Sequence, residues 1–397
     1  MSFSGNPSAQ ADKIYFDMTY TNVDSISTAP KVCSFTETRT TPILLRPEEY
    51  YCSIVRYQLE TATLPVFIPI IQYNSSDVNA SIYSFTLEWV DPSGGTYTSG
   101  QTYMSYAPQN LAAQVPSPPS SSANGLQNNN TTYYNVYNIQ YAIYLFNQTL
   151  TTAFAALVAN AAASSKTLPT TNAPVISISS DNGSDPIFVL NCDLDGYDTT
   201  ATSYIRIYCN QAMYQLFSAF PAYYLSDTAS AGKNIQIQTT TFGGVTVTQF
   251  PSWNPTYNAI QVFGSNSTIS AFSPITSIVF ASNTMPVVPN QISAPLLSVN
   301  GLSVSGNNGN NNNISQILTD FISPNMQYQP VITYEPTAQY RLISMLGNQP
   351  LSKIDVSVFW VDIFGNQNPL YLASGSTLTI KFLFTKKSSM IDKSAFL

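Results

Sequence analysis

Apolar and polar residues alternate along several segments near the two ends of this 397-residue chain. A period of two residues with aromatic enrichment is typical of a β-strand that buries one face. "SIYSFTLEWV" (81–90) predicts a strand whose apolar face carries Tyr83, Phe85, Leu87 and Trp89. "YYCSIVRYQL" (50–59) predicts a second strand, with one face formed by Tyr51, Ser53, Val55, Tyr57 and Leu59.

The same alternation returns close to the C-terminal end. The last predicted strand turns one set of residues inward, namely Leu378, Ile380, Phe382 and Phe384. The residues expected to face outward are Thr379, Lys381 and Thr385. The preceding segment, "IDVSVFWVDI" (354–363), is apolar on both faces, which favours a central strand or one covered on its second side.

The pattern between residues 92 and 230 differs. A stripe with steps of three and four predicts a helix of more than five turns, formed by Ile139, Ile143, Phe146, Leu150, Phe154, Leu157 and Ala161. A second helix is expected from about Cys209 to Phe220, where Pro221 ends it. Strands are expected in "PIFVLNC" (186–192) and "SYIRIYC" (203–209). The Pro-, Ser- and Asn-rich stretch 115–132 is expected to be an exposed loop.

From Asn234 onward the β pattern resumes. "NIQIQTTTFGGVTVTQF" (234–250) predicts a hairpin with Gly243 and Gly244 at its turn. Further strands are expected in 261–264, 275–282 and 296–304, and a flexible loop in 306–313.

These patterns predict a mainly β fold: a jelly-roll β-sandwich built from N- and C-terminal segments, with an inserted α/β domain. The expected divisions are a flexible arm 1–12, a sandwich 13–91 plus 234–390, an insertion 92–233 and a tail 391–397. We expect the most buried residues to include Trp89, Phe359, Trp360, Phe382 and Phe384. A double jelly roll stays open as an alternative, although few strands are predicted between 92 and 230.

Composition points to a surface covered by other protein chains. Charged residues make up 9% of the chain, against about 25% in ordinary soluble domains. The chain has 26 Tyr and 21 Phe, residue types that are enriched in interfaces. A polar, Tyr-rich extracellular domain is the alternative interpretation.

The net charge of −7 argues against a broad nucleic-acid or anionic-membrane surface. The exception is a basic C-terminal cluster, which could lie near nucleic acid or form a solvated end: Lys381, Lys386, Lys387 and Lys393. No stretch approaches the roughly 18 uninterrupted apolar residues of a membrane span.

Residues for catalysis are scarce. The chain has no histidine, which removes Ser-His-Asp and Cys-His catalysis and His-ligated metals. Its four cysteines contain no CxxC pair and are expected to be reduced and buried, as suits a reducing cytoplasm: Cys33, Cys52, Cys192 and Cys209. We therefore assign no catalytic, cofactor-binding or metal-binding residue and expect no cofactor and no enzyme activity.

Two acidic loops are the remaining candidates for a cation site. "NCDLDGYD" carries Asp193, Asp195 and Asp198, and "SDNGSD" carries Asp181 and Asp185. Such loops can supply oxygen ligands to calcium. Neither has EF-hand spacing, and Asp, Asn and Gly are ordinary turn residues, so turns are the favoured interpretation.

The segment "VFWVDIFGNQNPLYLASGSTLTIKFLFTKK" (358–387) resembles the ending of penton or minor capsid proteins of virophages and polinton-like viruses. The segments "ILTDFISP" (317–324), "YEPTAQYRLISM" (334–345) and "TSIVFASNTMPVVP" (276–289) fit the same resemblance. It implies a single jelly roll that forms a homopentamer at each icosahedral vertex, among double-jelly-roll major capsid proteins. It also implies that the insertion projects outward.

The leading hypothesis is thus a structural viral capsid protein, the penton, located at the capsid vertex of a virion assembled in the host cytoplasm. Its expected partners are its own copies, the major capsid protein and other minor capsid proteins. The alternative is a jelly-roll binding module or spike head that recognises a glycan or host surface. An enzyme is the third hypothesis, and it would need a carboxylate pair from distant segments.

Overall fold

The structure is a computed structural model of the whole chain. It describes residues 10–23, 30–73, 75–109, 117–119, 127, 129, 131–179, 186–228, 232–240, 246–250, 254–287, 316–322, 329–334, 341–363 and 367–394. The loops expected at 306–313 and around Gly243, the strand expected at 296–304, and Asp181 and Asp185 lie outside these ranges.

The chain divides into two compact units. Unit 1 comprises residues 1–64 and 274–397, and unit 2 comprises residues 65–273. Each unit contains its own sheets and is described separately.

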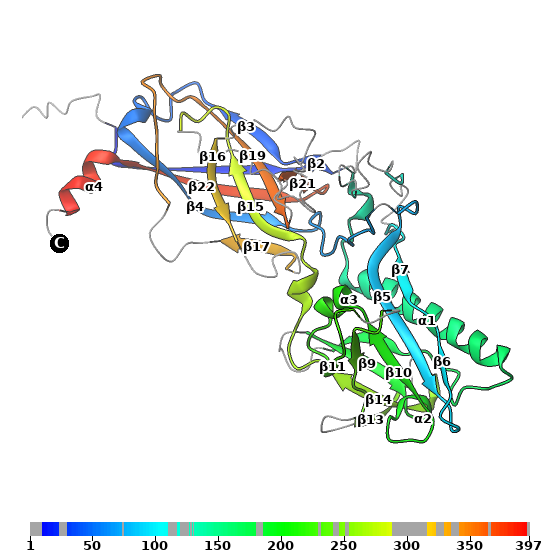
Figure 1. Cartoon of the computed structure of the whole chain (residues 1–397). Helices are drawn as coiled ribbons and strands as arrows, with labels where there is room; N and C mark the ends of the chain where they lie inside the picture. Colours follow the sequence, from blue (N-terminus) through cyan, green and yellow to red (C-terminus); the bar gives the residue numbers. More distant parts are fainter. Residues whose placement is uncertain are drawn as a thin grey trace, which may run out of the picture. The chain divides into compact units, whose positions relative to one another are not determined.

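Unit 1 is a sandwich of two antiparallel sheets. The β1 sheet has the order β1 (Lys13–Thr21), β22 (Thr377–Lys386), β4 (Tyr50–Glu60) and β17 (Val331–Tyr334), and β18 (Ile343–Ser344) also pairs with β4. The β19 sheet has the order β16 (Ile317–Phe321), β15 (Ile275–Ala281), β19 (Lys353–Asp362) and β20 (Gln367–Pro369), with β3 (Ser34–Thr38) also on β19. A small pair joins β2 (Lys31–Val32) to β21 (Tyr371–Leu372), and α4 (Lys387–Ser394) follows β22 (Figure 1).

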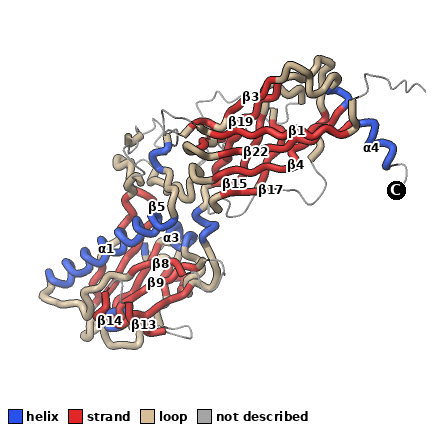
Figure 2. Tube along the Cα trace, turned by 180° about the vertical axis from the view of Figure 1, so that it is seen from behind, coloured by secondary structure: helices blue, strands red, loops and turns tan. Residues whose placement is uncertain are grey.

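Strands from the two ends of the chain pair as the sequence predicts. Figure 2 shows β22 between β1 and β4. Nine residue pairs join β1 to β22 without a register shift, from Lys13 opposite Thr385 to Thr21 opposite Thr377. The mainly β sandwich fold, formed by early and late segments together, is therefore confirmed.

Aromatic rings connect the two sheets of unit 1. The Tyr57 ring on β4 lies 5.1 Å from that of Phe280 on β15 and 4.6 Å from that of Phe321 on β16. At the opposite side of the sandwich, Tyr20 on β1 stacks on Phe35 of β3 at 5.0 Å. Such offset contacts add to the hydrophobic burial that holds the sheets together.

The predicted core of unit 1 is confirmed for three of its residues. Phe382 and Phe384 are completely buried, and Trp360 is buried. Phe359 is only half-buried, because it points to the opposite face of β19 from Trp360.

The prediction that alternate residues from Tyr51 to Leu59 share one face of β4 is wrong over the first half of the strand. The register shifts so that Phe382 lies opposite Ile54 and Lys381 lies opposite Arg56, which leaves Val55 as an extra residue. Such a bulge reverses the alternation. Cys52 and Ile54 therefore share the core face with Tyr57 and Leu59, a change that a strict two-residue period misses.

Unit 2 contains two further antiparallel sheets. The β5 sheet has the order β11 (Ala222–Tyr224), β12 (Ile235–Ile237), β10 (Tyr204–Cys209), β5 (Ala80–Val90) and β6 (Thr96–Thr98), and β7 (Thr102–Ser105) also pairs with β5. The β9 sheet has the order β13 (Thr246–Phe250), β14 (Asn254–Phe263), β9 (Ile187–Asp193) and β8 (Val175–Ser179). Its helices are α1 (Ile139–Ala163), α2 (Leu194–Tyr197) and α3 (Gln211–Leu216).

Several expectations for this region need correction. Strand β5, expected in the sandwich, pairs with β10 of unit 2, and Trp89 is buried there with its indole N–H donated to Ser203 Oγ. Alternation shows that a strand has a buried face but does not show which partner covers it. The units also divide at residues 65 and 273, not at 92 and 233. The hairpin expected in 234–250 is wrong, because β12 and β13 belong to different sheets.

The two predicted helices have different outcomes. α1 spans Ile139–Ala163 and buries the predicted stripe except for half-buried Ile139, with the side chain of Asn138 capping its first turn. The second helix is shorter than predicted, because Cys209 still pairs with Phe85 in the sheet and Asn210 caps α3.

By length and composition alone α1 could cross a membrane. Ten of its side chains are buried within unit 2, and the helix packs on β5, β6, β7 and β8. This is the arrangement of a core helix in a folded unit, and it gives no separate support for a membrane span.

Candidate functional site

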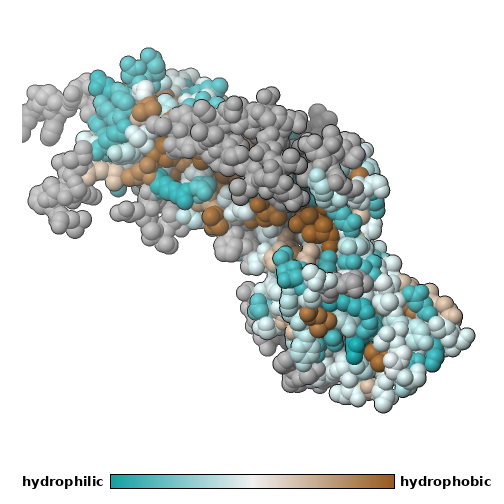
Figure 3. Space-filling model, in the orientation of Figure 1, coloured by the Kyte–Doolittle hydropathy of each residue, from teal (hydrophilic) through white to brown (hydrophobic). Residues whose placement is uncertain are grey.

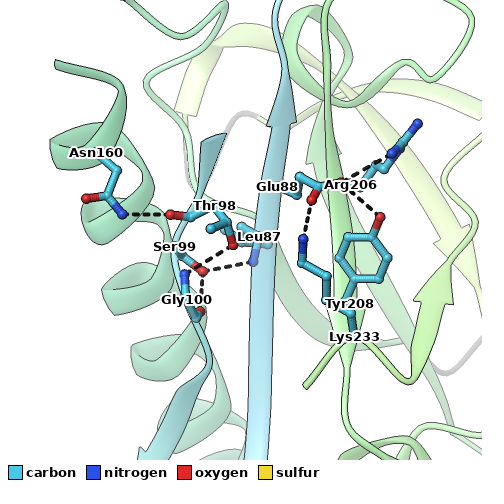
Figure 4. A network of polar contacts seen from close by, with 9 residues as sticks. All are labelled: Leu87, Glu88, Thr98, Ser99, Gly100, Asn160, Arg206, Tyr208 and Lys233. Carbon is cyan, nitrogen blue, oxygen red and sulfur yellow. Dashed lines mark hydrogen bonds and ion pairs between the residues drawn. The ribbon is translucent and has the colours of Figure 1, made fainter. Parts of the chain in front are cut away.

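The carboxyl end of β5 is the main charged centre of unit 2. Glu88 is buried and accepts hydrogen bonds from Arg206 Nη1 at 3.2 Å and from Tyr208 Oη at 3.1 Å through its Oε1 atom. Its Oε2 atom is ion-paired with Lys233. Figure 4 shows the three partners converging on one carboxylate, from β10 and from the segment before β12.

Register explains this convergence. Arg206 lies directly opposite Glu88 in the β5–β10 pair, and Tyr208 is two residues farther along the same face of β10. Burial raises the pKa of Glu88, but the hydrogen bond and charge of Lys233, with Tyr208 and Arg206, outweigh it and lower the pKa below its usual value. Burial and the Glu88 charge raise the pKa of Tyr208 to about 12. Glu88 is thus held as an anion.

A second carboxylate lies three residues farther along. Asp91 Oδ1 accepts hydrogen bonds from the Ser93 hydroxyl at 2.7 Å and the Gly95 amide at 2.8 Å. Its Oδ2 atom is 2.9 Å from Lys166 Nζ, just after the end of α1. The hydrogen bonds from Lys166 and Ser93 lower the pKa of Asp91 to about 2.

Further polar contacts join α1 to the adjacent strands. Asn160 of α1 donates to the backbone oxygen of Thr98 at 2.7 Å. Ser99 Oγ accepts from the Leu87 amide at 3.0 Å and donates to the Gly100 oxygen (Figure 4). Together with Lys166, these contacts fix the C-terminal half of α1 to the end of β5.

In unit 1 a row of three charged side chains crosses the β1 sheet. Asp17, Lys381 and Arg56 are in register across β1, β22 and β4. Asp17 is 3.4 Å from Lys381 Nζ and 3.6 Å from Arg56 Nη2. Lys381 also lies 5.4 Å from the ring centroid of Tyr15, which is exposed.

The predicted basic C-terminal cluster is distributed among partners. Lys386 is 3.5 Å from Glu49 Oε2. Lys387 donates to the Met345 backbone oxygen at 3.1 Å and lies over the Tyr51 ring. Lys381 lies in the ladder with Asp17, and the side chain of Lys393 is outside the described part. Each described lysine of the predicted cluster therefore contacts a different partner within unit 1.

In the acidic loop 191–198, two of the candidate calcium ligands accept hydrogen bonds from nearby residues of the chain. Asp193 accepts from Asn172 Nδ2 at 2.7 Å, from the Thr170 hydroxyl and from the Asp195 amide at the start of α2. Asp198 accepts from the amide and hydroxyl of Thr200 in a turn. Within the described residues, no group of three or more His, Cys, Asp and Glu side chains is placed to hold a metal ion.

The four cysteines are free and buried, as predicted. Burial raises the pKa of Cys33 to about 12 and raises the pKa of Cys52, Cys192 and Cys209 still further. These thiols therefore stay protonated at neutral pH and are poor nucleophiles.

Several carboxyl groups have pKa values below the usual range. Where carboxyl groups have shifted pKa values, the shift is downward: Glu49, Glu88, Asp91 and Asp355. A general acid or base needs a pKa near the working pH. These four carboxyl groups are therefore ionised near neutral pH and serve as hydrogen-bond acceptors and ion-pair partners.

The surface of unit 2 is mostly polar, with few charged residues, nine acidic and three cationic. In Figure 3 its visible face is mostly pale, with separate teal and brown spots. Its exposed large apolar side chains are distributed over several elements: Tyr73, Tyr103, Tyr144, Val158, Tyr223, Tyr224, Leu225 and Phe263. Exposed tyrosines on a polar surface are consistent with the prediction that other protein chains cover much of this surface.

Comparison with known proteins identifies the family. Residues 14–386 match the family described as Sputnik minor capsid protein V18/19. This chain belongs to that family. Structural protein V19 of Sputnik virophage is 30% identical over 197 residues, which is 48% of this chain and 86% of V19. Uncharacterized protein V18 of the same virophage is 32% identical over 116 residues, 29% of this chain and 66% of V18.

Solved structures agree with the assignment to the V18/19 family. A chain in the cryo-EM structure of the Sputnik virophage matches 96% of this chain and 99% of its own length, with 26% identity and a TM-score of 0.76. The mavirus penton protein matches 94% of this chain and 99% of its own length, with 14% identity and a TM-score of 0.61. The latter likeness shows the fold.

The chain is therefore a structural protein of a viral capsid, and not an enzyme. The resemblance stated for residues 358–387 is confirmed at the level of the family. The alternative of a binding module or spike head is not favoured by these comparisons. Sequence reasoning missed the Glu88 and Asp91 centres, because their partners Lys166, Arg206 and Lys233 come from distant segments.

Proposed function

We propose that this protein is the penton of its capsid: a homopentamer at each icosahedral vertex, in contact with double-jelly-roll major capsid proteins and other minor capsid proteins. The observation that carries the proposal is the likeness to the mavirus penton protein over 94% of this chain. Membership of a minor capsid protein family supports it. Assembly in the host cytoplasm belongs to the same proposal, and the free thiols are compatible with a reducing compartment.

Unit 1 is the proposed shell-forming part. A ring of identical subunits needs two different, complementary surfaces on each copy. The sandwich offers two sides, one at β1 and β3 and the other at β16 and β17, marked by the Tyr20–Phe35 and Phe321–Tyr334 contacts. We propose that neighbouring copies meet along these sides.

Unit 2 is the proposed outward-facing part of the penton. It would project away from the shell, because little positive charge is available on it to face a packaged nucleic acid. This orientation accords with the net charge of −6 of unit 2, which has three cationic and nine acidic residues.

The test is the mass and shape of the recombinant chain, by light scattering after size exclusion and by negative-stain microscopy. A particle of about 217 kDa, five times 43.4 kDa, with five-fold views is the expected result. Because assembly can require partner capsomers, virions are examined as well. Virions whose vertices lack this protein would refute the proposal.

A further inference from the structure

Charge is divided unequally between the two units. Unit 2 contains three cationic and nine acidic residues, a net charge of −6. Unit 1 contains eleven cationic and twelve acidic residues, a net charge of −1. Unit 2 therefore carries nearly all of the net charge of −7 of the whole chain.

Internal ion pairs engage every cationic residue of unit 2. Lys166 is paired with Asp91, and both Arg206 and Lys233 are paired with Glu88. These pairs lie at the end of β5, where the two carboxylates are buried. The cations thus neutralise structural carboxylates and compensate none of the acids elsewhere on the unit.

Seven acids of unit 2 remain, and three of them are exposed on different elements, whereas Asp193 is buried and Asp181 and Asp185 lie outside the described residues. Asp77 lies before β5, Asp195 lies in α2, and Asp227 follows β11, and all three are exposed. Residues 92–165, which include α1, carry no charge of either sign. The field of unit 2 therefore has one sign, and this unit has no unpaired cation with which to contact the acids of another copy.

We infer that unit 2 is an electrostatic spacer: copies of unit 2 repel one another, so that self-association through unit 1 strengthens as ionic strength rises. The inference rests on the proposed penton ring, which brings several copies together. The Debye length is about 30 Å at 0.01 M salt and about 8 Å at 0.15 M. For six like charges on neighbours roughly 30 Å apart, Coulomb's law with this screening gives about tenfold weaker association per contact at the lower salt concentration.

The predicted increase of association with salt distinguishes this inference from an attraction between opposite charges. Complexes held by opposite charges weaken as salt is added, because screening removes attraction. Here screening removes repulsion, and the apolar and hydrogen-bonded contacts of the sandwich sides stay. The inference also predicts that the location of the acids matters, and not the total charge alone.

The experiment is sedimentation velocity of the full chain at 10 and 150 mM NaCl, across a range of protein concentrations. The test variant combines Asp77→Asn, Asp195→Asn and Asp227→Asn in unit 2. The matched control removes the same number of charges from unit 1 by Asp12→Asn, Glu48→Gln and Glu49→Gln, which lie outside the strands proposed to meet a neighbouring copy. We expect association of the wild type and control to strengthen at least tenfold with salt, and the test variant to lose most of this dependence.

The outcomes separate this inference from the proposed penton function. A pentamer whose association is independent of salt, or is weakened by salt, overturns the spacer and leaves the pentamer intact. Equal effects of the two triple variants overturn it as well. If the chain stays monomeric at every salt concentration, the ring does not form in solution from this chain alone. The spacer is then tested on the single chain.

The test on the single chain measures the local potential of each unit. One cysteine is introduced at an exposed threonine of unit 2, by Thr151→Cys, or of unit 1, by Thr19→Cys. The native cysteines are buried, so they give a low background. A dianionic disulfide reagent, compared with a neutral one, is expected to react several-fold more slowly at residue 151 than at residue 19 in 10 mM salt. Equal ratios at both positions overturn the inference.

Discussion

The two units stabilise a buried carboxylate in different ways. In unit 1, Asp355 of β19 accepts hydrogen bonds only from neutral donors among the described residues: the hydroxyls of Ser282 and Thr284 and the amides of Asn283 and Thr284. In unit 2, Glu88 is bound by Arg206, Lys233 and the Tyr208 hydroxyl. The two residues are equally buried, at 9% and 8% exposed.

The comparison shows two ways to stabilise a buried anion, which differ in how much solvation the partner groups lose. Asp355 is stabilised by groups that lose little solvation, and its donors come from one tight loop after β15. Glu88 requires the partial burial of two cations, which also must lose water. The first arrangement is local and neutral, whereas the second connects β5 to β10 and to the segment before β12.

The largest expected effect comes from Asp355→Ala. Its neutral donors would lose their acceptor inside the protein, and leaving buried donors unpaired costs about 1–3 kcal/mol each. We expect the free energy of unfolding of unit 1 to fall by about 3 kcal/mol, measured by hydrogen exchange of peptides from β15 and β19.

Asp355→Asn is the matched control. Most of the donors contact Oδ1, which Asn retains, so a clearly smaller loss is expected. Equal losses in the two variants would show that charge, and not the number of acceptors, stabilises this loop.

Glu88→Gln should have the next largest effect, confined to unit 2. It removes the negative charge but keeps the shape, so Arg206 and Lys233 lose their counter-charge while staying partly exposed. We expect the free energy of unfolding of unit 2 to decrease by about 2 kcal/mol, seen as faster hydrogen exchange in β5 and β10. Tyr208→Phe, which removes one neutral donor, should cost about 1 kcal/mol. The reverse ranking would contradict the importance of the charges.

Acid should affect both units in the same direction. The pKa values of Glu88, Asp91 and Asp355 are lowered in the folded chain, so folding is favoured above their unfolded values of about 4. This contribution is present near pH 7 and is lost as pH falls from about 5 toward 2, where Asp91 titrates. Thermal unfolding across this range should show it. In Glu88→Gln, part of the acid-dependent loss should disappear from unit 2 alone; an unchanged profile would refute the linkage.

The smallest effect is expected for the exposed ladder of unit 1. Asp17→Asn breaks contacts with Lys381 and Arg56, but all three side chains reach solvent. Surface ion pairs contribute about 0–1 kcal/mol, and salt weakens them. We expect a change within about 0.5 kcal/mol in chemical denaturation. A loss comparable to that of Glu88→Gln would remove the distinction between buried and exposed charge.

The sequence predicted the elements better than their partners. Alternation located β5 and β22, a run that is apolar on both faces located β19, and the three-and-four stripe located α1, because these patterns depend on local burial alone. The assignment of β5 to the sandwich was wrong, since pairing with β10 depends on contacts across more than a hundred residues. The bulge at Val55 was missed because an extra residue leaves no local sequence signal.

The charged centres were also beyond the reach of local patterns. Glu88 meets Arg206 through strand register and meets Lys233 across 145 residues. Asp355 meets its loop across about seventy residues. By contrast, the buried state of the cysteines followed from residue type and chain length, which need no knowledge of contacts.

Because β22 lies between β1 and β4, the β1 sheet can be completed only after the last part of the chain has been translated. Ser376, just before β22, bonds Glu60 at the end of β4 across 316 residues. At about 5–20 residues per second, the ribosome needs roughly 15–60 s to make the stretch between them. All strands of unit 2 fall inside that stretch and can pair while translation continues. The sandwich gains β22 only afterwards, so a nascent chain on the ribosome lacks the finished β1 sheet of unit 1 while its unit 2 is already made.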